Sequence, residues 1–457
     1  MSSPLVLPVP EGPSLPDLAA GLSDDRLPAL LDSGGPATPE ARWSLLAFDP
    51  VETVQARVRP GGAAIADVWN ALCRRWPDAR PAAPDEDLPG FRGGAVGWLG
   101  YDLGRELERL PTIASPDADL PDLHFGLYPF ALAHEHGTGR RLVVGRGSRD
   151  EAEGFAREVA SLAERATAVG PVDGVGDVVD STFDRAGYER AVECVREHIL
   201  DGDVYQVNLA QRFEVPCTGR PEALHAALRR RFPAPFGALL RTPGLSIISS
   251  SPELFLRKRG ANVQSRPIKG TRPRHADSAR DAELRAALES SEKERAELAM
   301  IVDLVRNDLG RTAAVGSVQV EQPFQTDAWS TVFHRVATVR SETEPDTSAL
   351  DVLQAAFPPA SVTGTPKIRA MEVIENLEPV RRHVYTGAIG WIGPDGDLDL
   401  SVAIRIATLV DGRLLIPVGS GITLASDPAA EYEETLHKAR AIFDVLGLPL
   451  PLAPAAE

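Results

Sequence analysis

The sequence predicts an α+β fold in which largely antiparallel sheets are covered by helices. Two observations support this prediction. Strand-like runs follow one another through hairpin turns as well as through helices, which argues against a doubly wound parallel sheet. Stretches with an apolar residue every three or four positions lie between those runs and are long enough to form helices. No internal repeat is visible.

The composition sets the class of protein. A chain of 457 residues with 43% hydrophobic and 25% charged residues is typical of a globular protein of two to three domains. The net charge of −17 argues against binding to nucleic acid, which needs a basic face. No run approaches the roughly 18–20 apolar residues of a membrane span. The N-terminus lacks the basic region of a signal peptide, and three scattered cysteines form no disulfide or metal pattern, so we expect a cytoplasmic protein.

Local patterns divide the first part of the chain into strands and helices. Strands are expected where apolar and polar residues alternate or glycines crowd aromatics, at 43–59, 90–101 and 123–144. Helices are expected at 63–75 and 149–166. Residues 167–180, TAVGPVDGVGDVVD, have no aromatic residue and little pattern. We therefore predict an N-terminal region, 1–166, a linker, 167–180, and a second region, 181–457.

The second region opens with a helix capped by Thr182 or Asp184 and stopped by Gly202. Its apolar face is formed by Tyr188, Ala191, Val192, Val195 and Ile199. A strand at 204–213, a helix at 221–231 and a strand at 245–250 follow.

The stretch 249–274 contains the first candidate for chemistry. Two extended runs surround the break Arg-Gly-Ala-Asn at 259–262, which predicts a hairpin. Folding near Gly260 brings the carboxylate of Glu253 close to the amine of Lys269, and Gly270-Thr271 supplies bare backbone and a hydroxyl beside them. The pair is either an edge-strand salt bridge or an acid beside a nucleophilic amine.

The scarcity of lysine favours the second interpretation. Only five of the 48 basic residues are lysine. They are Lys258, Lys269, Lys293, Lys367 and Lys438. Where charge alone is needed this sequence uses arginine, so a lysine indicates a position that guanidinium cannot fill, since only an amine can lose its proton and attack carbon.

Two predicted helices carry paired carboxylates. Glu294 and Glu297 share a face of the helix 291–309, and Glu431, Glu434 and Lys438 share a face of the helix 430–446. Each face is either solvated or, if the two meet, part of a site for a hard cation. Carboxylate oxygens with waters suit Mg²⁺. Spacing on separate helices does not establish that they meet.

Six motifs in order resemble the chorismate-utilising enzymes. They are SSSPELFL, PIKGTRPR, KERAELAMIVDLVRNDLGR, PKIRAMEVIENLEP, AIRIATL and AEYEETLHKAR. The likeness covers about 185–445, so 181–457 is identified as a chorismate-binding catalytic region, and the first region is similar to that of anthranilate synthase component I. Lysine in PIKGT is the pattern of aminodeoxychorismate synthase component I, where anthranilate synthases have PIAGT. Gln206 stands where water-adding relatives carry a lysine.

The resemblance implies two interleaved α/β subdomains with antiparallel sheets packed face to face and helices outside. It implies that chorismate and ammonia give 4-amino-4-deoxychorismate, on the route to para-aminobenzoate and folate. The chain has no glutaminase motif, so ammonia would come from a glutamine amidotransferase subunit. Lys269 would attack ring C2 while Glu253 protonates the leaving C4 hydroxyl.

The resemblance also assigns the remaining site residues. Glu297 and Glu434 match Mg²⁺ ligands, with Glu294 and Glu431 beside them or reached through water. Tyr385 and Arg405 match the residues that grip the enolpyruvyl carboxylate, joined by backbone N–H groups of Gly419, Ser420 and Gly421. Other positions of the substrate pocket are Gly270, Thr271, His334, Ser361 and Lys438.

Several alternatives stay open at this point. His334 and Tyr385 are also compatible with a core histidine and with sheet packing, and Lys367 with a structural role at a helix N-terminus. The chain could instead be an anthranilate synthase, a lysine Schiff-base enzyme, or a non-catalytic sensor of chorismate or an amino acid. The sensor hypothesis rests on the surroundings of Ser33 and Trp43, which resemble the region that holds tryptophan in some relatives.

Overall fold

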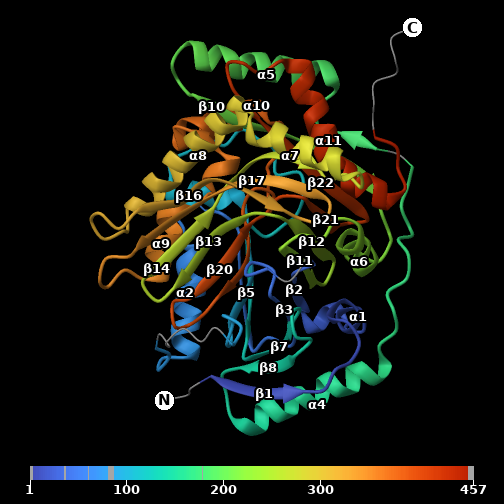
Figure 1. Ribbon diagram of the computed structural model, residues 1–457. Helices are drawn as coiled ribbons and strands as arrows, with labels where there is room; N and C mark the ends of the chain where they lie inside the picture. Colours follow the sequence, from blue (N-terminus) through green and yellow to red (C-terminus); the bar gives the residue numbers. More distant parts are fainter. Residues whose placement is uncertain (1–3, 35–37, 60, 81–86, 178, 451–457) are drawn as a thin grey trace.

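Two large sheets form the centre of the molecule (Figure 1). The computed structural model describes residues 4–34, 38–59, 61–80, 87–177 and 179–450. Every strand ladder in those residues is antiparallel, which confirms the predicted fold class. Sheet A has the order β1-β8-β7-β3-β2-β11-β12-β21-β22-β10-β18, with β9 on β10, and sheet B has the order β15-β17-β14-β13-β20-β19-β5-β6-β4, with β16 on β17.

The strands of sheet A are β1 (Leu5–Val9), β2 (Ala29–Asp32), β3 (Trp43–Ala47), β7 (Phe130–Glu135), β8 (Arg141–Gly145), β9 (Asp180–Ser181), β10 (Gln206–Pro216), β11 (Phe236–Thr242), β12 (Leu245–Ser251), β18 (Gly364–Thr365), β21 (Ile406–Val410) and β22 (Arg413–Ile422). Those of sheet B are β4 (Glu52–Ala56), β5 (Gly94–Leu99), β6 (Leu123–Tyr128), β13 (Leu254–Arg259), β14 (Asn262–Arg266), β15 (Ile268–Pro273), β16 (Gln319–Ala328), β17 (Val332–Glu342), β19 (Ala388–Ile392) and β20 (Leu398–Val402).

The α-helices are α1 (Leu15–Ala20), α2 (Ala64–Arg75), α3 (Gly104–Leu107), α4 (Arg149–Arg165), α5 (Arg185–Leu200), α6 (Pro221–Arg231), α7 (Ser278–Glu289), α8 (Glu292–Gly310), α9 (Ala349–Ala356), α10 (Lys367–Leu377) and α11 (Pro428–Leu446). None of the helices in the described part of the chain combines the length and the apolar composition needed to cross a bilayer.

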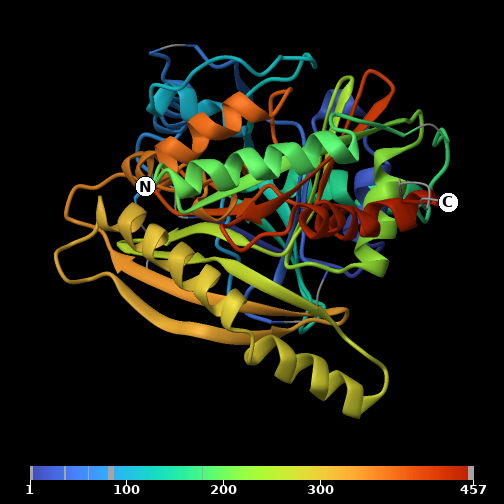
Figure 2. The ribbon, with the colours of Figure 1, turned by 90° about the horizontal axis from the view of Figure 1, so that it is seen from above.

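The two sheets pack face to face, and helices cover their outer faces. One core cluster lies between the sheets and contains Leu240 and Ile406 from sheet A beside Trp98 and Trp391 from sheet B. A second cluster joins the outer face of sheet A to α1, α4, α5, α6, α10 and α11. A third joins sheet B to α2, α8 and α9. The architecture is therefore helix, sheet, sheet, helix, as Figures 1 and 2 show from two directions.

Both sheets take strands from either side of the segment 167–180. In sheet A, β2 pairs with β11, and in sheet B, β5 pairs with β19. The described part of 167–180 connects α4 to β9 and α5 without helix of its own. The segment 167–180 therefore divides the sequence into two regions, but each sheet contains strands from both regions.

Local sequence signals place many elements where they occur. Asp184 caps α5 by accepting a hydrogen bond from the Gly187 N–H, which selects Asp184 over Thr182. The predicted hairpin forms from β13 and β14, with Gly260 in the left-handed turn between them. Strand β11 and helices α7 and α9 were not predicted, whereas α10 begins at Lys367, where the sequence suggested a helix N-terminus.

Candidate active site

Lys269 and Glu253 lie at the end of the hairpin, on adjoining elements of sheet B. Glu253 precedes β13 directly, and Lys269 is the second residue of β15, one step beyond the partner strand β14. Ser361 lies near both groups: its carbonyl accepts from Lys269 Nζ at 3.4 Å, and its side chain lowers the pKa of the Glu253 carboxyl against the larger effect of burial. The hairpin thus brings together the acid and the amine that the sequence singled out.

Burial shifts both groups toward their neutral forms. Glu253 is only 4% exposed, and this burial raises the pKa of its carboxyl to about 7 although Ser361, Lys269 and the Ile268 N–H oppose the shift. Burial also lowers the pKa of Lys269; the Lys438 charge adds to this effect, while Glu297, Glu253 and Glu434 oppose it. The lowered pKa of the amine and the raised pKa of the acid are what nucleophilic attack with general-acid assistance requires.

Gly270 and Thr271 shape the wall beside Lys269. Gly270 has φ +88°, and a Cβ there would lie 2.9 Å from the Glu294 carboxylate and from Leu288, so glycine is required on both counts. The hydroxyl of Thr271 hydrogen bonds with Nδ1 of His334 at 2.9 Å across the β15–β17 ladder. Burial, together with the Arg405 charge, lowers the pKa of His334 to about 4, so its ring is neutral at pH 7.

The carboxylate faces of α8 and α11 do meet, which spacing left open. Lys293 Nζ, on α8, lies 3.9 Å from Glu297 on the same helix and 3.9 Å from Glu431 on α11. The pKa of Glu297 is raised by burial and, further, by the negative charges of Glu434 and Glu431, while Lys269 and Lys293 oppose the shift. The two helices therefore enclose one acidic site next to Lys269.

The α11 carboxylates differ in their surroundings. Buried Glu431 accepts hydrogen bonds from the hydroxyls of Ser420 and Ser426, the latter at 2.7 Å. Glu434 pairs with Lys438 at 2.7 Å. Burial works against ionisation of Glu434, but the lysines, Lys438 first, outweigh it and lower its pKa to about 2. Glu434 thus stays ionised throughout the neutral range.

The carboxylate-only donor set fits a hard cation such as Mg²⁺. Glu297 and Glu434 repel each other, and one Glu294 oxygen is buried without a hydrogen-bond partner in the described structure. The other Glu294 oxygen accepts from Arg272 at 2.7 Å. Among the described residues, no three of the four glutamates have oxygens that all lie within 4.8 Å of one another, and Lys293 is the cation between Glu297 and Glu431.

Arg405 contacts α11, and Tyr385 and Glu434 are among its electrostatic neighbours. The Arg405 guanidinium donates to the Lys438 carbonyl at 2.8 Å, and no carboxylate pairs with it in the described part of the chain. Its backbone has φ +52°, an uncommon conformation for arginine. Burial lowers the pKa of Arg405, against the Tyr385 and Glu434 contributions. A half-buried cation without an ion partner is suited to the carboxylate of a ligand.

The segment Gly419–Gly421 leaves backbone groups exposed to the site. Strand β22 pairs with β21 only up to Leu415, so from Ile416 onward its ladder is with β10 alone. Alternate backbone groups of such a strand face away from its single neighbour. A Cβ on Gly419 would approach Tyr385 Oη and Asn208 at 3.0 Å, and one on Gly421 would lie 2.6 Å from Gln206 Nε2 and 3.4 Å from Lys269 Nζ. These glycines keep room between the strand and the site.

The structure also separates functional from structural lysines. Lys367 donates to Asp308 at 2.8 Å and to two carbonyls, those of Ala356 and Pro358, and it is the first residue of α10. These contacts agree with the structural role at a helix N-terminus that the sequence suggested for Lys367. Lys293 was missed by the sequence reasoning, although the scarcity of lysine that pointed to Lys269 applies to it equally.

A separate cavity of about 320 Å³ lies next to the Ser33 and Trp43 region. Both residues line it, together with Trp391 from sheet B and Phe91 from the segment before β5. Ser33 is held by hydrogen bonds from its hydroxyl to the carbonyls of Trp43 and Pro235.

A lysine of lowered pKa near a carboxyl of raised pKa, next to an acidic helix pair, is an arrangement typical of an enzyme active site. The profile of the chorismate binding enzymes matches residues 30–444. The chain therefore belongs to the chorismate binding enzyme family.

Known relatives agree on the family and differ in their reactions. The chain is 39% identical to aminodeoxychorismate synthase component 1 of Salmonella typhimurium, over 91% of this chain and 92% of that protein. It is 40% identical to anthranilate synthase component 1 of Streptomyces coelicolor, over 80% of this chain and 75% of that protein. The crystal structure of anthranilate synthase component I from Streptococcus pneumoniae superposes with a TM-score of 0.76 at 30% identity, covering 88% and 92% of the two chains.

Proposed function

We propose that this protein is an aminodeoxychorismate synthase component I, which converts chorismate and ammonia to 4-amino-4-deoxychorismate. The observation that carries the proposal is Lys269, whose amine has a lowered pKa and lies beside the protonatable Glu253. Enzymes that add ammonia directly to ring C2 do not need a lysine there. A covalent route through the protein does, because it requires an amine that is free to attack carbon.

The residues of the site support a two-step substitution. Lys269 Nζ attacks C2 of chorismate while the C4 hydroxyl leaves with the proton of Glu253, and the products of this step are an amine adduct and water. Ammonia then adds at C4, the bond from C2 to Lys269 breaks, and the added nitrogen returns a proton to Glu253. Atoms and charges balance, so the net reaction exchanges hydroxyl for amine at C4 and keeps the enolpyruvyl group.

Binding of the dianionic substrate is shared between cations and backbone. Arg405 and Tyr385 hold the enolpyruvyl carboxylate, with N–H groups of the segment 419–421 beside them. In this proposal Mg²⁺ is held by Glu297 and Glu434, with Glu294 and Glu431 next to them, and it supplies charge that attracts the ring carboxylate. Neutral His334, fixed by Thr271, bounds the pocket without adding charge.

The source of ammonia is a separate glutamine amidotransferase subunit in this proposal. The names of the Salmonella and Streptomyces relatives contain "component 1", which is said of those proteins. In this chain Cys73 is exposed, Cys194 half-buried and Cys217 buried, and no hydrogen bond joins any of them to a histidine in the described structure. A glutaminase needs such a cysteine and its base.

Anthranilate synthase is the second candidate, because the Streptomyces coelicolor relative is 40% identical. The two reactions are separated by incubating the purified chain with chorismate, Mg²⁺ and ammonium, and then with glutamine, followed by mass spectrometry. The proposal predicts that the product is aminodeoxychorismate, which keeps the enolpyruvyl group on the ring. Anthranilate and free pyruvate would overturn it in favour of the second candidate, and chorismate binding without any product would favour a sensor.

A further inference from the structure

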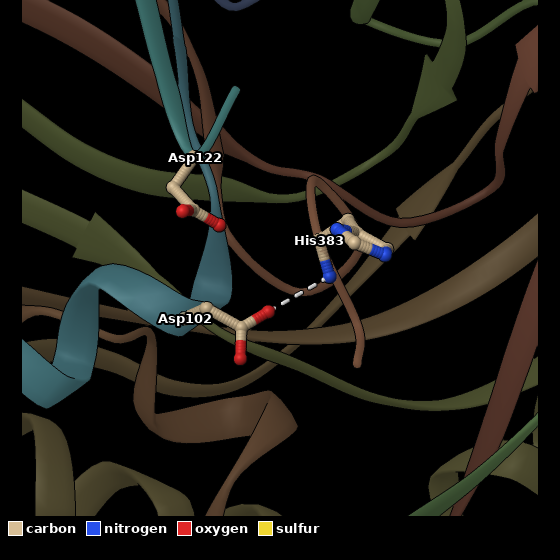
Figure 3. A group of neighbouring side chains, drawn as sticks. All are labelled: Asp102, Asp122 and His383. Atoms are coloured by element: carbon tan, nitrogen blue, oxygen red, sulfur yellow. Dashed lines mark hydrogen bonds between the residues drawn. The ribbon is translucent and has the colours of Figure 1, made fainter. Parts of the chain in front are cut away.

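A second cluster of ionisable side chains lies outside the active site, where the two regions of the chain join. Asp102 belongs to the short 3₁₀ turn after β5, Asp122 stands directly before β6, and His383 lies in the loop that leads to Tyr385 (Figure 3). The Tyr101 N–H donates to the His383 carbonyl at 2.7 Å and the Gly100 N–H to the Asp122 carbonyl at 2.6 Å. Backbone hydrogen bonds thus fix all three segments against one another.

The three side chains have metal-ligand spacing. One carboxylate oxygen from each of Asp102 and Asp122 and one ring nitrogen of His383 all lie within 4.8 Å of one another. Asp102 is 2% exposed, and Asp122 and His383 are each 5% exposed. Among the described residues, no other group of three acidic, histidine or cysteine side chains meets this spacing.

The buried imidazole of His383 supports a metal site independently of the two carboxylates, because its ring nitrogens lack hydrogen-bond partners among the described residues. Neither of its ring nitrogens has a hydrogen-bond partner of good geometry within the described structure, although the ring is buried. The nearest acid on its far side is Asp117, 3.5 Å from Nε2, which is an ion-pair distance but long for a hydrogen bond. The His383 backbone also has φ +53°, so the chain holds this residue in an uncommon conformation. A buried imidazole in this setting needs a proton or a metal to satisfy it.

The carboxylates keep acceptor capacity toward the centre of the cluster. Asp102 accepts the His383 backbone N–H at 3.0 Å and Arg105 Nε at 3.3 Å, and Asp122 accepts the Val58 N–H at 2.7 Å. A carboxylate has about four acceptor sites, so neither is saturated. Asp102 also forms an ion pair with Arg105 on the side away from Asp122 and His383, which leaves its other acceptor sites available.

We propose that Asp102, Asp122 and His383 bind one divalent transition-metal ion of the zinc type, which fastens the N-terminal strands to the loop that carries Tyr385. Two carboxylate oxygens and one imidazole nitrogen, with a water as fourth ligand, suit Zn²⁺, Mn²⁺ or Fe²⁺ better than Mg²⁺, which prefers oxygen alone. The ion is structural, because the cluster is enclosed. This site is separate from the Mg²⁺ site of the proposed function. The proposal of a bound ion therefore does not depend on which reaction the protein performs.

The test uses the full-length protein stripped with EDTA and dialysed, then titrated with Zn²⁺ by calorimetry. We expect one tight equivalent in wild type, and a loss of affinity of about 100-fold or more in Asp122→Asn, since even a supporting residue costs 10–100-fold. His383→Asn is the second variant, because asparagine tolerates positive φ and preserves the backbone. Glu297→Gln is the matched control, which removes an acid from the active site and retains the tight equivalent.

A readout on the wild-type protein covers the case in which a variant fails to fold. Pulsed electron paramagnetic resonance of the Mn²⁺- or Cu²⁺-loaded chain is expected to detect coupling to a histidine nitrogen, which an all-glutamate site lacks. Absence of tight Zn²⁺ binding to the stripped wild type would overturn the proposal. Tight binding that disappears in Glu297→Gln and persists in Asp122→Asn would equally overturn it and assign the ion to the active site.

Discussion

Replacing Glu253 by glutamine should abolish amination and at the same time stabilise the protein at high pH. Glu253→Gln removes the proton donor for the leaving hydroxyl but keeps the size of the side chain. The wild-type carboxyl is 4% exposed, and burial raises its pKa to about 7 from the ordinary 4.5. Ionised Glu253 is therefore a cost to the folded state that glutamine does not carry.

The sign and size of this effect follow from proton linkage. Between pH 4.5 and 7 the folded chain keeps a proton at Glu253 that the unfolded chain has released, so wild-type stability falls as pH rises through this window. The loss is complete above about pH 7 and amounts to about 3 kcal/mol, since the two pKa values differ by about 2.5 and each pKa unit is worth about 1.4 kcal/mol. At pH 5 the same calculation gives a loss of stability of about 1 kcal/mol or less.

Urea unfolding of both proteins in EDTA at pH 5 and pH 8 measures the difference. We expect Glu253→Gln to be more stable than wild type by about 3 kcal/mol at pH 8 and nearly equal at pH 5. Glu283→Gln, on the exposed helix α7, is the control and should match wild type at both pH values. A gap between Glu253→Gln and wild type that does not grow with pH would refute the argument that burial holds Glu253 protonated, and with it the basis for its role as an acid.

Four further outcomes test the site. Lys269→Arg should lower turnover with ammonia roughly 1,000-fold and leave the Kd for chorismate nearly unchanged, because guanidinium does not deprotonate; near-normal turnover would exclude the covalent route. Glu297→Gln and Glu434→Gln should each abolish activity, as should excess EDTA with the wild type, and full activity in EDTA would remove the Mg²⁺ assignment. Arg405→Lys should raise the KM for chorismate about 10–100-fold with little change in kcat, since the two-pronged contact with a carboxylate is lost; an unchanged KM would mean that another group holds the carboxylate. The isolated chain should form no product from glutamine, and glutamate release by the chain alone would contradict the need for a partner subunit.

Much of the fold and part of the site followed from short-range patterns. Helix caps such as Asp184 and the turn at Gly260 act through hydrogen bonds and backbone angles that span a few residues, so the sequence states them directly. The pairing of Glu253 with Lys269 was predictable for the same reason, since one hairpin sets it. Elements without such signals were missed, among them β11, which is buried in the middle of sheet A between β2 and β12.

Contacts between distant segments could not be read from the sequence. Lys293 and Glu431 are 138 positions apart, and their 3.9 Å approach depends on how α8 and α11 pack on two different sheets. The same holds for Asp102 and His383, joined by a hydrogen bond across 281 positions. Nothing local in the sequence encodes these distances.

The sequence by itself therefore determined many of the elements, the family resemblance and the choice of lysine at position 269. Tertiary structure decided that the two carboxylate helices share one site, that both regions of the chain build each sheet, and that Glu253 is buried and Lys269 half-buried. The physical reason is range. Periodicity, capping and turn chemistry act within a few residues, whereas burial and electrostatic coupling depend on every segment that packs around a group, wherever it lies along the chain.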